Sequence, residues 1–115
     1  MMEGSLRGEL PFSVLQDFFV DKFFLCVGAV NADSGLTEHD SEDAQLKSLM
    51  IGRAKEVILV VDSSKFGHTA FKSVCSFDQI SKIVTDKRPP EAMVTQLMNA
   101  GTEIHVVTGE TAAIL

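Results

Sequence analysis

A run of five aliphatic residues at positions 57–61, VILVV, constrains the fold more than any other stretch of this chain. An unbroken β-branched and aliphatic run suits a strand that is buried on both faces. Strands of this kind belong to parallel sheets that are covered by helices. The run therefore predicts an α/β domain, and the other apolar stretches are interpreted around it.

A cluster of polar residues follows this strand at once. It consists of Asp62, Ser63, Ser64 and Lys65, with Gly67 close behind. In open α/β sheets, ligands bind beyond the carboxyl ends of the strands. A carboxylate, two hydroxyls and an ammonium at that place can hold a small polyhydroxylated or phosphorylated molecule. The alternative is a polar turn in which the Ser and Asp side chains bond the local backbone.

The composition indicates one globular domain and excludes several classes of protein. A chain of 115 residues suffices for one domain with a modest core. The net charge of -6 argues against a general basic surface that grips nucleic acid. No run approaches the roughly 20 apolar residues of a membrane span, and no secretory signal is expected. Cys26 and Cys75 lie among apolar neighbours, which indicates buried, reduced thiols of a cytoplasmic protein.

The part of the chain before the central strand is expected to form a helix, a strand and a loop. Apolar residues recur at helical spacing over residues 11–20 (Phe12, Leu15, Phe18 and Phe19). A turn at residues 21–22 leads to a second continuous apolar run, residues 23–30, which predicts another buried strand. Residues 31–37 are polar, and they contain a glycine that can adopt positive φ, Gly35, so they are expected to form a loop.

Residues 38–43 gather one histidine and four acidic side chains. Histidine and carboxylates together allow the hypothesis of a metal site. The alternative is the start of a helix, because acidic residues favour a helix N-terminus and Asp40 or Ser41 is a good N-cap.

The helix itself is expected over residues 42–55, with one apolar stripe (Leu46, Leu49, Met50 and Ala54). Lys47 lies about 100° around the helix from Leu46, at the edge of this stripe. The lysine either reaches over the sheet or remains a solvated residue on the flank of the helix.

The second half of the chain continues the alternation of strands and helices. The expected elements are a segment that covers the end of the sheet, a single turn, a strand, a helix, a last strand and a tail (residues 68–76, 77–80, 82–85, 86–100, 103–107 and 108–115). Apolar residues mark the covering segment (Phe71, Val74 and Cys75) and the helix (Met93, Val94, Leu97 and Met98). Such alternation gives right-handed βαβ units and a parallel sheet.

Several common catalytic and nucleotide-binding motifs are missing from the sequence. It contains no G-x-x-x-x-G-K-[ST] phosphate loop, no G-x-G-x-x-G after a strand and no G-x-S-x-G elbow. Ser63, Ser64 and His68 are close in sequence, but a hydrolytic triad also needs an orienting acid and an oxyanion site. No helix-turn-helix pattern with a basic recognition helix is present either.

Four motifs in a fixed order resemble one known family. They are G-L-T at 35–37, E-D-A-x-x-K-x-x-M at 42–50, D-S-S-K-F at 62–66 and T-D at 85–86. Together they look like the C-terminal effector-sensing domain of DeoR/GlpR-type bacterial transcriptional regulators. The resemblance covers residues 6–107.

The resemblance implies an α/β fold with a Rossmann-like parallel sheet flanked by helices, similar to sugar-phosphate isomerases and CoA transferases. It implies sensing and not catalysis, without a cofactor. Members of this family bind phosphorylated sugars or related metabolites and thereby change the operator affinity of an attached DNA-binding domain. Carried over to this sequence, the ligand positions are Thr37, Lys47, Asp62, Ser63, Ser64 and Lys65. Two ammonium groups can meet a phosphate, and the carboxylate and hydroxyls can hold sugar hydroxyls.

The sequence also departs from the family pattern. The helix-turn-helix and the first half of the sensor are not in this chain, and Gly28-Ala29 stands where the family usually has Asp-Gly. The change at residue 28 removes an expected partner for sugar hydroxyls. A partial sheet is expected to expose an edge and an apolar face. We therefore expect a homodimer with residues 12–24 at or near its interface, and no contact with nucleic acid or membrane.

Two other functions remain open at this point. One is a module that has lost its ligand and only associates with other regulators, which Gly28-Ala29 favours. The other is a small isomerase-like enzyme, since the related fold supports that chemistry, although isomerisation needs a base placed near the substrate carbon.

Overall fold

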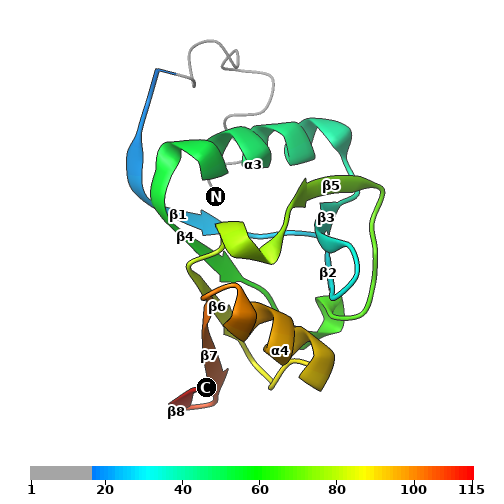
Figure 1. Cartoon of the computed structure of the whole chain (residues 1–115), viewed down its shortest axis with the longest axis vertical. Coiled ribbons are helices and arrows are strands. Elements are labelled where there is room, and N and C mark those ends of the chain that lie inside the picture. The colour runs from blue at the N-terminus through cyan, green and yellow to red at the C-terminus, as the bar shows by residue number, and fades with distance from the viewer. Residues whose placement is uncertain (1–16) are drawn as a thin grey trace.

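The computed structural model describes residues 17–115, and its centre is a five-stranded sheet in the order β1-β4-β6-β7-β8 (Figure 1). The strands are β1 (Val20–Leu25), β4 (Ala54–Val60), β6 (Lys82–Thr85), β7 (Glu103–Thr108) and β8 (Thr111–Ile114). The first four run parallel and β8 runs antiparallel to β7. The α/β class is confirmed, and the sheet is mostly parallel.

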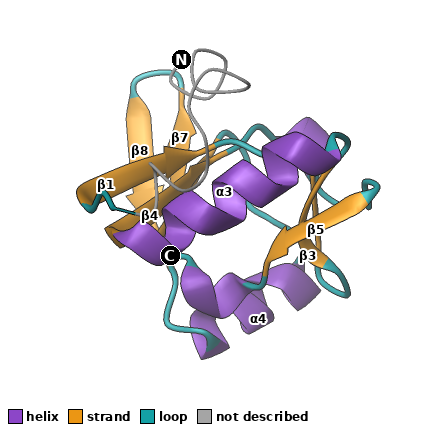
Figure 2. Cartoon of the chain, turned by 90° about the horizontal axis from the view of Figure 1, so that it is seen from above, coloured by secondary structure: helices purple, strands orange, loops and turns teal. Residues whose placement is uncertain are grey.

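A second, smaller sheet lies beside the first and was not predicted. It is antiparallel, in the order β2-β3-β5, with β2 (Ala29–Asn31), β3 (Gly35–Glu38) and β5 (Lys72–Cys75). Two helices, α3 (Ser41–Arg53) and α4 (Glu91–Asn99), and two short 3-10 helices, η1 (Ser63–Lys65) and η2 (Phe77–Gln79), complete the described part (Figure 2).

The core lies between one face of the five-stranded sheet and the two helices. Alternate residues of the inner strand β4 face it, Val57 and Leu59, followed by Val61 just past its end. Side chains of both helices belong to the same cluster (Ala44 and Ile51 from α3; Met93, Val94 and Leu97 from α4). Both described helices therefore pack on the same face, whereas a sheet flanked by helices was expected.

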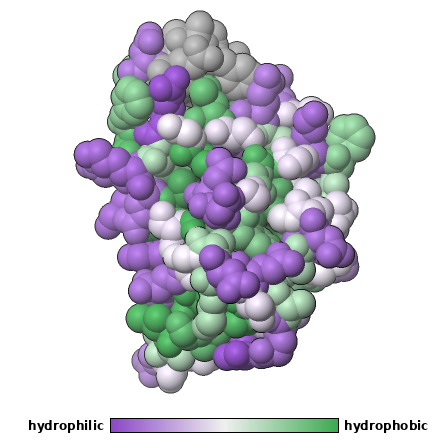
Figure 3. Space-filling view, viewed as in Figure 1, coloured by the Kyte–Doolittle hydropathy of each residue, from purple (hydrophilic) through white to green (hydrophobic). Residues whose placement is uncertain are grey.

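The opposite face of the sheet is only partly covered. Ile58 is 7% exposed, as expected for a strand buried on both faces, but Val60 is 42% exposed. The large apolar side chains that remain exposed in the described part are Phe18, Phe19, Phe24, Val60, Phe71, Met98, Val107 and Ile114. In the view of Figure 3, hydrophobic areas are interrupted by hydrophilic side chains.

The region before α3 differs from its prediction. Of the helix expected over residues 11–20, residues 11–16 lie outside the described part, and Val20 already begins β1. The predicted turn at residues 21–22 lies within β1 as well. The apolar run at residues 23–30 forms two strands with a break at residues 26–28, because the chain leaves the parallel sheet there and joins β3.

The predicted loop at residues 31–37 is mostly a β-hairpin. Only residues 32–34 form the turn between β2 and β3. Gly35 has φ +74°, as the sequence allowed, and a Cβ there would lie 2.8 Å from the carbonyl oxygen of Cys75. The glycine thus permits β3 to approach β5 closely.

The later elements agree better with the sequence. α3 begins at the predicted place and ends two residues early, because Ala54 starts β4. β6, η2 and β7 lie where they were predicted. α4 contains the predicted apolar stripe but begins only at Glu91, after Pro90, and Gly101, with φ +83°, follows it. The predicted tail is wrong, since residues 111–114 form β8. Phe71 does not cover the sheet end but is 79% exposed, and Met98 of the predicted stripe is 49% exposed.

No helix within residues 17–115 is long and apolar enough to cross a membrane.

Candidate functional site

The register of the parallel strands places three chain segments at one level beyond the carboxyl edge of the sheet. The last paired residues are Leu25 with Leu59, and Val60 with Val84. Gly28 and Asp62 lie equally far beyond the first of these pairs, and Asp62 and Asp86 equally far beyond the second. Adjacent strands of a sheet are about 4.8 Å apart. The predicted polar cluster therefore follows β4 at the edge where α/β domains bind ligands, with Asp86 from the end of β6 in contact with Ser63.

Asp62 organises the turn that follows β4. Its carboxylate accepts a hydrogen bond from the backbone N–H of Ser64 at 2.9 Å and another from the Ser64 hydroxyl. These bonds, the hydroxyl bond first, together with the positive charge of Lys65, hold the pKa of the Asp62 carboxyl below its ordinary value. The polar-turn interpretation is thus confirmed for Asp62 and Ser64.

Asp86 joins the ends of β4 and β6. Its carboxylate accepts the backbone N–H of Ser63 at 2.7 Å and the Ser63 hydroxyl at 3.3 Å. The backbone bond is the main reason that the pKa of the Asp86 carboxyl is also lowered. A shallow cavity of about 400 Å³ opens here, lined by Asp62, Thr85, Asp86 and valines of β4, β6 and β7. Thr85 and Asp86 were recognised in the sequence as a polar strand end, but they were not among the predicted ligand positions.

Lys65 ends η1 and is half-buried. The next residues connect the two sheets: Phe66 forms an isolated bridge with Val30, and the N–H of Gly67 donates to the Val30 carbonyl at 2.8 Å. The chain then reaches Ala70, whose N–H donates to the Thr37 hydroxyl oxygen at 2.8 Å. Residues 66–70 therefore link the polar cluster to the second group of predicted positions.

That second group consists of Thr37 and Lys47, and both are buried, each 3% exposed. The Lys47 side chain reaches inward from α3 and its Nζ lies 2.5 Å from Glu38 Oε2. Of the two interpretations of Lys47, the solvated flank residue is wrong. Glu38 was not among the predicted ligand positions, although it directly follows the G-L-T motif.

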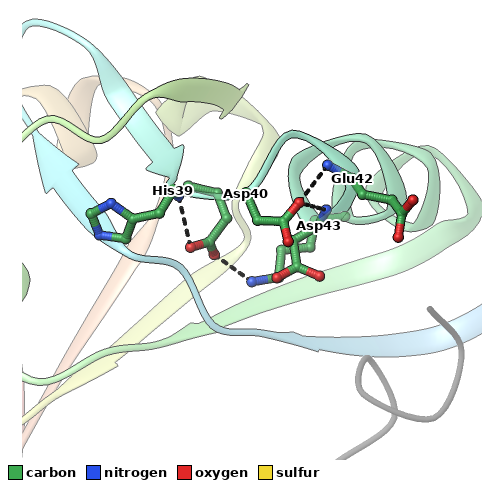
Figure 4. Close-up of polar contacts among 6 residues, drawn as sticks. His39, Asp40, Glu42 and Asp43 are labelled. Carbon is green, nitrogen blue, oxygen red and sulfur yellow. Dashed lines mark hydrogen bonds and ion pairs between the residues drawn. The ribbon is translucent and has the colours of Figure 1, made fainter. Parts of the chain in front are cut away.

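The acidic segment before α3 caps the helix. Asp40 is the N-cap residue, and its carboxylate accepts the backbone N–H groups of Glu42 at 2.8 Å and Asp43 at 3.4 Å. Figure 4 shows the His39 ring pointing away from these carboxylates. Within residues 17–115, no group of three His, Cys, Asp or Glu side chains is placed to hold a metal ion.

The two cysteines have different surroundings. Cys75 is buried, and burial, aided by the charge of Asp78, raises the pKa of its thiol to about 12. Cys26 is half-buried, so the expected burial holds fully only for Cys75.

A larger cavity lies away from all six predicted ligand positions. It measures about 730 Å³ and opens between the β2–β3 turn, η2 and the end of α4. Uncharged polar side chains and one carboxylate, Asp33, are the polar part of its lining. Because no cation lines it, we place the candidate anion site at the carboxyl edge, where Lys65 lies.

The chain is a mostly parallel α/β domain with polar residues at the carboxyl edge, which is where domains of this class bind small ligands when they bind them. Comparison with known proteins gives the family. The family model described as the DeoR C terminal sensor domain matches residues 2–87, and the chain belongs to this family. The predicted resemblance is thus confirmed.

Three relatives illustrate the match, and all are transcriptional repressors and not enzymes. The glycerol-3-phosphate regulon repressor of Escherichia coli K12 is 30% identical over 83% of this chain and 38% of its own length. The repressor CsqR of the same strain is 30% identical over 88% and 39%. GlcR of Bacillus subtilis 168 is 33% identical over 88% and 39%. The chain thus spans about two fifths of the length of these relatives.

Proposed function

We propose that this chain is the effector-binding part of a DeoR-type transcriptional regulator and that its effector is a phosphorylated sugar or a related metabolite. The observation that carries the proposal is the position of residues 62–65 directly beyond the end of β4. The family membership supports a sensing role, and the chemistry of these side chains supports the class of ligand.

The proposed site has a cationic and a hydroxyl-binding part. Lys65 supplies the positive charge for the phosphate. Asp62, Ser63 and Ser64 supply the acceptor and donor groups for sugar hydroxyls. The other two predicted positions, Thr37 and Lys47, belong to β3 and α3, and both are buried.

The regulatory role extends beyond this chain. We propose that binding of the effector changes the operator affinity of a DNA-binding part of the regulator in the cytoplasm. One relative is named for the glycerol-3-phosphate regulon, which makes a phosphorylated polyol a sensible member of any ligand panel.

Thermal-shift titration tests the proposal. The panel contains phosphorylated sugars and glycerol 3-phosphate, with inorganic phosphate and unphosphorylated sugars as controls. A ligand at 100 times its dissociation constant adds about 2.7 kcal/mol to the free energy of unfolding. We expect a shift with one phosphorylated compound that is lost in Lys65→Ala and retained in Lys22→Ala, which removes an exposed lysine from β1.

A different result would favour the second candidate function, a module that associates with proteins without a ligand. The exposure of Phe18, Phe19 and Phe24 (56%, 72% and 60%) is the observation behind it. Absence of any shift in a folded protein would contradict effector binding and direct the search to protein partners.

A further inference from the structure

The ion pair between Glu38 and Lys47 is the most buried ion pair among the described side chains. Its exposed fractions are 11% for the Glu38 side chain and 3% for the Lys47 side chain. A buried ammonium needs a counter-charge, and Glu38 provides it at 2.5 Å. The backbone N–H of His39 donates to the other carboxylate oxygen at 3.1 Å, so both oxygens of Glu38 are fixed (Figure 4).

The Glu38 carboxylate occupies the space beside Gly28. A Cβ built on Gly28 would lie 2.8 Å from Glu38 Oε1 and 2.7 Å from the His39 ring. No larger residue fits at position 28 without displacing these groups. The carboxylate therefore takes up space that a side chain at position 28 would need.

Gly28 lies in the segment that follows β1, beside the segment that follows β4. The two strands pair up to Leu25 and Leu59, and Val30 and Phe66 form a bridge further along. The two segments stay together further along, because Gly67 N–H donates to the carbonyl of Val30. Glu38 thus places a carboxylate beside Gly28, in the segment that follows β1, although it comes from β3 of the smaller sheet.

The fixed carboxylate retains capacity for a ligand. Each carboxylate oxygen has two lone-pair positions, and the bonds from His39 N–H and Lys47 Nζ use one on each oxygen. An ionised carboxylate only accepts hydrogen bonds, so it suits a hydroxyl and repels a phosphate. Because Lys47 is already balanced by Glu38, Lys65 is the better partner for the anionic end of a ligand.

Building on the proposed function, we propose that Glu38 is a ligand-binding residue whose carboxylate accepts a hydroxyl of the sugar part of the effector. Lys47 is its positioning residue and does not hold the phosphate. Lys65 binds the phosphate at the opposite end of the site. Glu38 therefore determines which polyol is accepted, while Lys65 provides affinity for any phosphorylated compound.

Two probes separate these roles by calorimetric titration. Inorganic phosphate tests the anion position alone, and the phosphorylated sugar or glycerol 3-phosphate that gives the largest thermal shift tests both positions. In Glu38→Gln we expect the sugar phosphate to bind about 10- to 100-fold more weakly, the loss of one charged hydrogen bond, and inorganic phosphate to bind as in the wild type. Glu110→Gln, which makes the same change of charge in an exposed turn, should alter neither the affinity for the sugar phosphate nor that for inorganic phosphate.

Glu38→Gln leaves the Lys47 charge buried and can destabilise the domain, so a second variant is needed. Glu38→Gln combined with Lys47→Met removes both charges, and it should still bind inorganic phosphate while it loses affinity for the sugar phosphate. In the wild type, the Glu38 carboxyl ¹³C resonance should move with the sugar phosphate and stay unchanged with inorganic phosphate.

Each other outcome overturns the inference in a recognisable way. Tighter phosphate binding in Glu38→Gln would mean that Glu38 competes with phosphate for Lys47. Loss of phosphate binding in the double variant would assign the phosphate to Lys47. If Glu38→Gln binds the sugar phosphate as tightly as the wild type does, and binding still depends on Lys65, Glu38 is not a ligand-binding residue and the proposed function stands. No binding of either probe to the folded wild type would contradict both the role of Glu38 and the proposed function.

Discussion

At the scale of single residues, the candidate site is built from carboxylates that are already engaged. Asp62 holds the turn after β4 through Ser64, and Asp86 holds the same turn from β6 through Ser63. These bonds fix the backbone around Lys65 before any ligand arrives. Pre-organisation of this kind reduces the ordering cost of binding.

The pKa of the Asp62 carboxyl gives the first prediction. Its largest cause is the Ser64 hydroxyl, so Ser64→Ala should raise the pKa of Asp62 toward its ordinary value. Because the folded pKa is lowered, the stability linked to Asp62 is present above the unfolded pKa and is lost as the pH falls through the folded one. Carboxyl ¹³C NMR titration measures the pKa of Asp62 in the wild type and in Ser64→Ala.

Asp86 provides the control in the same titration. Its main partner is the backbone of Ser63, so its pKa should stay low in Ser64→Ala. An Asp62 pKa that does not respond to the substitution would contradict the hydrogen bond to the Ser64 hydroxyl.

At the scale of elements, one buried hydroxyl joins three parts of the chain. Thr102, between α4 and β7, is 4% exposed, and its hydroxyl contacts the carbonyls of Phe77 at 3.2 Å and Ile80 at 2.9 Å. It thereby connects the start of β7 to η2 and to the approach of β6. Removing the donor leaves a buried carbonyl without this partner, which costs free energy.

Thr102→Val should therefore lower the free energy of unfolding by about 1–3 kcal/mol. Val keeps the shape of the side chain and removes only the hydroxyl. Thr95→Val, the same change at an exposed position of α4, should stay within about 0.5 kcal/mol. Urea unfolding of both variants measures the difference, and equal midpoints would show that the Thr102 bonds add nothing.

At the scale of the whole molecule, the covering of the sheet is uneven. Both described helices pack on one face, and within residues 17–115 the edge strand β1 pairs only with β4. Phe24 of β1 is 60% exposed near this edge. Exposed apolar groups beside a sheet edge favour pairing with another chain.

We accordingly predict a homodimer at micromolar concentration, with the part of residues 12–24 that the structure describes at its interface. Phe24→Ser should weaken the dimer, because it removes an apolar contact at the sheet edge. Light scattering coupled to size-exclusion chromatography measures the mass. Phe71→Ser, which changes an even more exposed Phe in the segment before β5, should leave the mass unchanged, and a monomeric wild type would refute the prediction.

The sequence by itself determined the features that depend on neighbouring residues. The strand at 57–61, the strand at 82–85 and the helix that Asp40 caps all follow from local apolar patterns and capping chemistry. The polar turn after β4 is local as well, since Asp62 and Ser64 are two residues apart. The family resemblance rested on the same short motifs.

Only the tertiary structure decided the features that depend on distant parts of the chain. The apolar run at residues 23–30 divides between two sheets, and the residues after β7 return as β8, because pairing with remote strands outweighs local pattern. Likewise, Lys47 is buried and balanced by Glu38 because α3 packs against β3, and Gly28 makes the room for that carboxylate. The short motifs determined that residues 62–65 follow β4 directly, because this depends on neighbouring residues alone. The packing of α3 against β3 decided that Lys47 is buried beside Glu38, because the two residues belong to different elements.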